Sequence, residues 1–80
     1  MRVHLGKSPS AFHSFRDFDA PSDAFAYMWA MANVTRPERC WLWQRVDGWL
    51  NNDHLKDKVY PDDLKAKIWA FIEEDEAIQP

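Results

Sequence analysis

The chain has 80 residues and a mass of 9.5 kDa, a length that supports one hydrophobic core, so a single domain over residues 1–80 is expected. Ten Lys and Arg residues against thirteen Asp and Glu residues give a net charge of −3, which argues against a general nucleic-acid-coating protein. The longest uncharged apolar run has nine residues, too few for a membrane span, and the lone Cys40 cannot form an internal disulfide, so the cytoplasm is the expected compartment.

The first two elements are expected to be extended. Residues 2–5 predict a short strand that ends at Gly6. Within residues 11–19, three phenylalanines recur at every third position, a spacing that fits neither a helix nor a strand. Because an Asp-Ala-Pro break closes this stretch, we interpret it as a second extended segment.

A helix is predicted over residues 22–33, with Ser22 as its N-cap. The face opposite to its apolar stripe carries Ala26 and Ala30, where an ordinary surface helix has charged residues. Two interpretations are open: small alanines cost little when they are exposed, or another surface covers them. We favour the first, because scattered exposed apolar residues are normal on protein surfaces.

Residues 39–46 are rich in strand formers, and the Asp-Gly pair that follows is the strongest hairpin signal in the chain. A two-residue turn would pair Val46 with Trp49. Trp41 and Trp43 would then lie on the sheet face opposite to Trp49. Both faces of the hairpin would carry large apolar side chains, and one layer of helices cannot cover both.

The last helix is predicted over residues 61–74, because a proline and two aspartates favour a helix start there. Trp69 lies off the apolar stripe of this helix, so it either covers a neighbouring loop or meets a partner. The acidic residues 73–76 lie at the C-terminal end, where the helix dipole disfavours negative charge. A solvated, solubilising end and an interaction surface are equally compatible with this run.

These elements predict an α+β fold, in which a small antiparallel sheet of three or four strands carries the two main helices on one face. The spacing of the apolar residues places eight side chains in the core: Phe25, Met28, Ala32, Leu42, Leu64, Ile68, Phe71 and Ile72.

The sequence contains no motif of known catalytic chemistry. Its two glycines leave no phosphate-cradling loop, and no serine lies in a GxSxG pattern. The three histidines and Cys40 lack the spacing of metal ligands. We therefore expect a protein that is not an enzyme, with no catalytic residue, no cofactor and no metal.

Two stretches, SFRDFDAPSDAFAYMWAMAN at residues 14–33 and CWLWQRVDGWL at residues 40–50, resemble a pattern common among tiny proteins of phages and mobile elements. In that pattern a lead-in with Phe and Asp caps a helix, and a strand with an Asp-Gly turn follows. Several small anti-CRISPR proteins are built in this way, and the chain is similar to them in size, acidity and layout. The resemblance implies a stoichiometric blocker of a nucleic-acid-handling complex in the host cytoplasm, and the family has no common site residues.

Two functions are in question. The first is a non-catalytic protein-binding inhibitor or adaptor, whose partner is another protein or complex with a basic, nucleic-acid-binding surface. Its predicted binding surface joins the last helix to one face of the hairpin and comprises Trp69, Glu73, Glu74, Asp75, Trp41, Trp43 and Arg45. The alternative is a single-stranded nucleic-acid-binding module in which the Trp and Arg residues of the hairpin stack on bases, although the net charge argues against it. A homodimer through one of the Trp faces is compatible with both.

Overall fold

A four-stranded sheet and two helices make up the fold of this protein. The computed structural model describes residues 1–33, 39–44, 48–54 and 60–78. In chain order the elements are β1 (Arg2–Gly6), β2 (Phe12–Asp17), α1 (Pro21–Asn33), β3 (Arg39–Gln44), β4 (Gly48–Asn51), the short 3-10 helix η1 (Asn52–His54) and α2 (Asp62–Ile78). The predicted α+β fold with a small sheet is therefore confirmed, as are both extended segments of the N-terminal part.

The sheet has the order β2-β1-β3-β4, and each neighbouring pair is antiparallel. β1 lies inside the sheet, with His4 opposite Phe15 of β2 on one side and opposite Trp41 of β3 on the other. β2 and β4 form the two edges. β3 follows β2 and α1 in the chain, but it pairs with β1 and not with β2. Two strands that are far apart in the chain therefore lie side by side.

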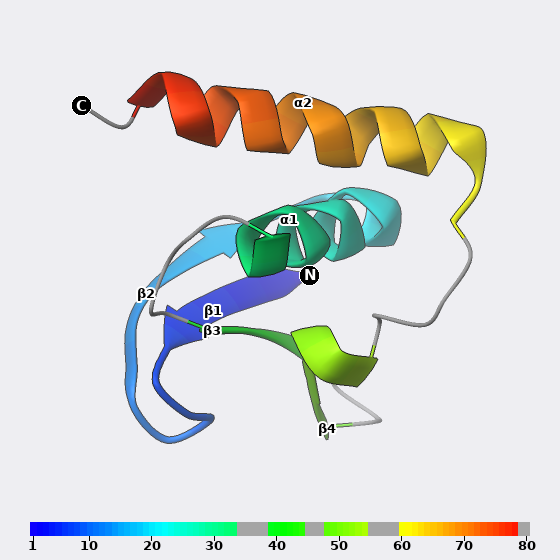
Figure 1. Ribbon diagram of the computed structural model, residues 1–80. Helices are drawn as coiled ribbons and strands as arrows, with labels where there is room; N and C mark the ends of the chain where they lie inside the picture. The colour runs from blue at the N-terminus through cyan, green and yellow to red at the C-terminus, as the bar shows by residue number, and fades with distance from the viewer. Residues whose placement is uncertain (34–38, 45–47, 55–59, 79–80) are drawn as a thin grey trace.

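The two helices stack on one side of the sheet in two layers (Figure 1). α1 lies against β1 and β3, and α2 packs mainly on the far side of α1. The prediction of two main helices on one face is confirmed, with α1 as the middle layer. A helix in that position must bury two opposite faces, which requires apolar or small side chains all around it.

The face of α1 toward the sheet forms the main core. Ala24, Met28 and Met31 pack there against Val3 of β1 and, from β3, against Cys40 and Leu42. Met28 and Leu42 are fully buried, as predicted from the sequence. Phe25 is only partly buried and packs at the margin of this cluster, and Ala32 is exposed, so its assignment to the core was wrong.

The face of α1 toward α2 explains the unusual alanines. Ala26 and Ala30 are buried, and Ala26 forms a second cluster with Leu64 and Ile68 of α2. The expectation that these alanines are exposed was therefore wrong, and the surface that covers Ala26 is the protein's own last helix. Small side chains at this contact allow the two helix axes to approach closely.

Four residues of α2 were predicted to reach the core. Leu64 and Ile68 are buried as predicted, and Phe71 and Ile72 are partly buried against the same cluster. The apolar stripe of α2 was thus recognised from its spacing alone, although its partner is α1 and not the sheet.

The hairpin between β3 and β4 has a different register from the predicted one. Trp43 pairs with Trp49, and Gln44 pairs with Gly48, so three residues separate the paired strands instead of two. Gly48 adopts a positive φ of 78°, a conformation that glycine accepts without strain. Because the shift from the predicted register is odd, Trp49 moves to the sheet face of Trp43. The predicted partner Val46 lies outside the described residues.

α1 ends at Asn33 as predicted but begins one residue earlier, at Pro21, and both ends of α2 differ from the prediction. The carbonyl of Ala20 accepts hydrogen bonds from the amides of Asp23 and Ala24, at 3.1 and 3.3 Å, so Ala20 caps α1 instead of Ser22. Pro21 then occupies the first helical position, where a missing N–H leaves no bond unmade. α2 continues to Ile78, four residues beyond the predicted end, so the acidic run belongs to the helix.

Substitution of Gly6 should disturb the turn between β1 and β2. A Cβ atom there would overlap the carbonyl oxygen of Ala11 and lie 2.7 Å from the Cα of Phe12, which are backbone atoms at a β-bulge. We expect Gly6→Ala to lower the free energy of unfolding by about 1–3 kcal/mol in a urea titration, whereas Lys7→Ala should change it by less than about 0.5 kcal/mol. Equal stability of Gly6→Ala and the wild type would contradict this close approach.

Candidate binding surface

The sheet face that points away from the helices carries a continuous layer of rings. Side chains alternate along a strand, so the residues between the core positions of each strand share this face. We call it the aromatic face; it comprises Arg2 and His4 of β1, Phe12, Phe15 and Asp17 of β2, Trp41 and Trp43 of β3, and Trp49 of β4. α1 and α2 both lie on the other side of the sheet (Figure 1).

The rings of the aromatic face pack on one another across the strands. His4 stacks on Phe12 with ring centroids 4.5 Å apart, and Trp49 meets His4 edge-on at 5.0 Å. Trp49 also contacts Trp43 at 4.8 Å and Phe12 at 4.9 Å. These distances are typical of favourable ring pairs, so the cluster forms a rigid surface with few free side-chain torsions.

Two rings of the cluster remain largely accessible to solvent. Phe15 is 55% exposed and Trp43 is 43% exposed, whereas Trp41 is 5% exposed beneath its neighbours. Exposed aromatic rings on a rigid, packed base are the usual composition of an interaction hot spot. The accessible part of the aromatic face is therefore the end of the sheet where these two rings lie.

Arg2 lies between the two exposed rings, because it pairs with Trp43 on β3 and with Asp17 on β2. Its Nε donates to Oδ1 of Asp17 at 2.7 Å and its Nη2 donates to Oδ2 at 3.1 Å. The guanidinium also lies 3.9 Å from the centre of the Phe15 ring. The hydrogen bond from Arg2 lowers the pKa of the Asp17 carboxyl below its ordinary value, so this pair is ionised at neutral pH.

Arg39 lies at the opposite end of β3, next to Gly6 of β1. Its Nη1 donates to Oδ2 of Asp53 at 3.3 Å. Within the described strands, both arginines of this sheet face are therefore paired with a carboxylate. The described part of this sheet face thus presents rings and two ion pairs, and each of its two described arginine charges has a carboxylate beside it.

His4 is neutral in this setting at physiological pH. Burial among the neighbouring rings lowers its pKa from the ordinary value of 6.5, and the positive charge of Arg2 lowers it further. Asp17 opposes this effect only in part. A neutral imidazole is able to stack on Phe12 as an aromatic ring, which supports the packing of the surface.

The lowered pKa of His4 predicts how the stability of the fold depends on pH. The unfolded chain takes up a proton at His4 near pH 6.5 while the folded chain does not, so the free energy of unfolding should fall as the pH drops below about 6.5. His4→Gln should lose this part of the pH dependence. The measurement is a set of urea titrations from neutral pH to about pH 5. Parallel curves for the two proteins would contradict the assignment to His4.

The structure separates the residues of the predicted binding surface into two groups. Trp43 is exposed on the aromatic face, whereas Trp41 is buried there and packs against Phe12. Arg45 lies outside the described residues. The prediction that Trp41 and Trp43 share one sheet face is correct. Their contacts with Phe12 and Trp49 were not predicted.

The second group lies on α2. Trp69 is 64% exposed, Glu73 and Glu74 are exposed, and the side chain of Asp75 lies outside the described part of the chain. α1 separates α2 from the sheet, so this group and Trp43 lie on opposite sides of the molecule and do not form one surface. The predicted continuity between them was wrong, because α2 packs on α1 and not beside the hairpin.

Six residues of the aromatic face were not predicted: Arg2, His4, Phe12, Phe15, Asp17 and Trp49. Phe12 and Phe15 are three positions apart, so strict alternation would place them on opposite faces of β2. The irregular register between Leu5 and Gly6 of β1 brings them to one face. Gly6 within the first strand was a signal for such an irregularity.

The chain matches no family model, and no curated protein and no solved structure is significantly similar to it. Among the residues that the structure describes, no helix combines the length and apolar character that crossing a membrane requires. The same residues contain no group of three His, Cys, Asp or Glu side chains close enough to hold a metal ion.

Proposed function

We propose that this protein is a non-catalytic protein-binding module and that it binds its partner through the aromatic face. The observation that carries the proposal is the exposure of Trp43 and Phe15 on a packed base of further rings. Rigid aromatic side chains lose little conformational freedom on binding, and such rings dominate the energetics of protein interfaces. The ion pair of Arg2 and Asp17 beside them provides a polar rim.

Charge favours a protein partner over single-stranded nucleic acid. A nucleic-acid platform needs cations that are free to neutralise phosphates, in addition to rings that stack on bases. The arginines that β1 and β3 place on this face, Arg2 and Arg39, each donate to a carboxylate. The net charge of −3 adds long-range repulsion of a polyanion.

A titration with labelled, mixed-sequence single-stranded oligonucleotides at low salt tests this choice. We expect no binding by the wild type in fluorescence anisotropy, because the positive charge of the face is compensated. The variant Asp17→Asn/Asp53→Asn removes both negative charges, so the charges of Arg2 and Arg39 are no longer compensated, and it should gain weak binding that disappears with salt. Tight, salt-sensitive binding by the wild type that Trp43→Ala abolishes would overturn the proposal in favour of the nucleic-acid module.

The finer proposal is that the module is a stoichiometric inhibitor of the anti-CRISPR type. The resemblance of residues 14–50 to such proteins is its support. The test is a DNA-cleavage assay with a purified CRISPR effector, in which cleavage should fall in proportion to the added protein and stop at a fixed molar ratio. Unchanged cleavage across a panel of effectors would remove this specific role and leave the binding module itself in place.

A further inference from the structure

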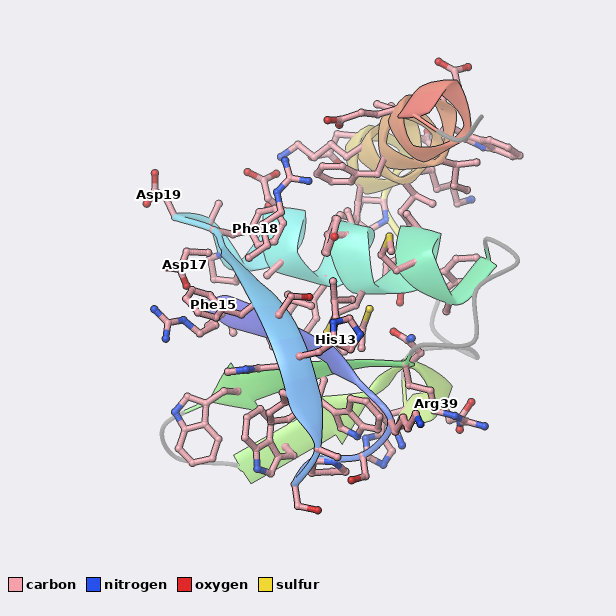
Figure 2. The ribbon with its side chains drawn as sticks, turned by 90° about the vertical axis from the view of Figure 1, so that its left-hand side faces the viewer. His13, Phe15, Asp17, Phe18, Asp19 and Arg39 are labelled. Atoms are coloured by element: carbon pink, nitrogen blue, oxygen red, sulfur yellow. The ribbon has the colours of Figure 1, made fainter. Side chains whose placement is uncertain are left out.

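β2 is an edge strand whose outer side is open. In the described sheet it pairs with β1 alone, and all residues from His13 to Asp17 are exposed. Figure 2 looks toward this strand and shows Phe15 and Asp17 on one side of its ribbon and His13 on the other. An exposed edge that carries a large apolar side chain is a template for pairing with a further strand.

The hydrogen bonds at the end of the strand show which backbone groups point outward. Met1 and Phe18 exchange both of their bonds, from the Phe18 amide to the Met1 carbonyl at 2.8 Å and from the Met1 amino group to the Phe18 carbonyl at 2.6 Å. In an antiparallel ladder such pairs alternate with pairs that are not hydrogen-bonded to each other. Arg16 therefore bonds to β1, whereas the N–H and C=O groups of Phe15 and Asp17 point to the open edge.

We propose that β2 pairs with β2 of a second copy of this chain, antiparallel about a two-fold axis at Phe15. The two Phe15 residues then exchange their outward N–H and C=O groups, and their rings meet on the aromatic face. On the other face of the sheet, Ser14 of each copy comes opposite Arg16 of its partner, so no like charges meet. A symmetric contact of this kind uses the same patch on both copies.

The neighbouring registers are less favourable. An axis at Arg16 would place two guanidinium groups directly opposite each other, and an axis at Asp17 would do the same with two carboxylates. An axis at Ser14 would rely on His13, which lies at the irregular part of the ladder, for the flanking bonds on both sides. The side chains of β2 thus favour one self-complementary register, which an unrelated strand would have no reason to match.

The dimer would join two sheets into one of eight strands and extend the aromatic face across the axis. The dimer shares Phe15 with the proposed binding surface, but its hydrogen bonds come from the backbone of β2, while Trp43 lies two strands away from the edge, so Trp43→Ala distinguishes the two proposals. Pairing of edge strands alone buries a small area, so we expect a reversible dimer.

Sedimentation velocity over a concentration series tests the dimer. The wild type should shift from the mass of one chain to that of two, and Phe15→Lys should weaken the association at least about ten-fold because two cations would meet at the axis. Ala66→Lys on the exposed side of α2 adds the same charge elsewhere and should leave the association unchanged. Phe15→Pro removes an outward N–H without breaking a bond to β1 and should also give monomers. Circular dichroism confirms the fold of each variant.

Amide hydrogen exchange identifies the contact in the unmodified chain. The amides of Phe15 and Asp17 should exchange more slowly as concentration rises, while the amide of Arg16, already bonded to β1, should not change. A monomer at every concentration would overturn the proposal. A dimer that persists in folded Phe15→Lys, or one that Trp43→Ala disrupts while the two edge amides stay unprotected, would also overturn it.

Discussion

Truncation of Ile68 to alanine is expected to lower the free energy of unfolding by about 2–5 kcal/mol. Ile68 is buried between α2 and α1, where it packs with Leu64 against Ala26. The methyl group of Ala26 is too short to move into the space left by the truncation, so we expect part of it to remain as a cavity. Urea titration followed by tryptophan fluorescence measures the change, and for a domain of this size the loss is a large fraction of the total stability.

The neighbouring Trp69→Ala variant is the matched control, because the same helix carries this side chain on its exposed side. Its removal should change the free energy of unfolding by less than about 0.5 kcal/mol. A loss below about 1 kcal/mol for Ile68→Ala would show that α2 does not depend on this contact with α1. Unfolding of Trp69→Ala would show that the indole is part of the core.

The contact between the helices also shows what the sequence could and could not predict. The apolar spacing of residues 61–74 identified the buried stripe of α2 correctly, because a 3.6-residue period depends only on the helix itself. The partner of that stripe was missed, since the alanines that receive it were interpreted as exposed. An alanine face is compatible with solvent and with a close helix contact, and only the three-dimensional arrangement distinguishes the two.

The hairpin shows a second kind of limit. The existence of both strands was predicted correctly, because residue preferences are local, but Gly48 belongs to β4 and not to the turn. Their register was not predicted correctly, since a loop of three residues fits the same sequence as a loop of two. Because the loop is one residue longer than predicted, Trp49 lies on the aromatic face and not on the opposite one. The length of the loop therefore decides which residues belong to the candidate site.

The aromatic face depends on long-range pairing to an even greater degree. Phe12 and Trp49 lie more than thirty positions apart in the chain and meet with ring centroids 4.9 Å apart, through a sheet order that local patterns do not determine. The sequence did indicate that the chain has more large apolar side chains than one small core can bury. The large apolar side chains that stay exposed are Trp43 and Phe15 on one side of the sheet and Trp69 on α2.

Truncation of Trp43 should have the largest effect on partner binding. If this ring is a hot spot of the interface, Trp43→Ala should weaken the complex by about 2 kcal/mol or more, which is about a thirty-fold rise in Kd. The loss should lie mainly in faster dissociation, because a buried contact stabilises the complex more than it steers the encounter. The measurement is a titration with a partner that co-purifies in a fixed ratio and is then prepared in pure form.

Trp69→Ala provides the matched control for this experiment, because it removes the same side chain, also exposed, from the opposite side of the molecule. It should leave both the rate constants and the melting temperature unchanged. The contact of Trp43 with Trp49 means that Trp43→Ala also needs a check of folding by circular dichroism. If Trp69→Ala speeds dissociation, charge reversal at Glu73 and Glu74 slows association, and folded Trp43→Ala binds normally, then the partner docks on α2 and the acidic helix, not the aromatic face, is the binding surface.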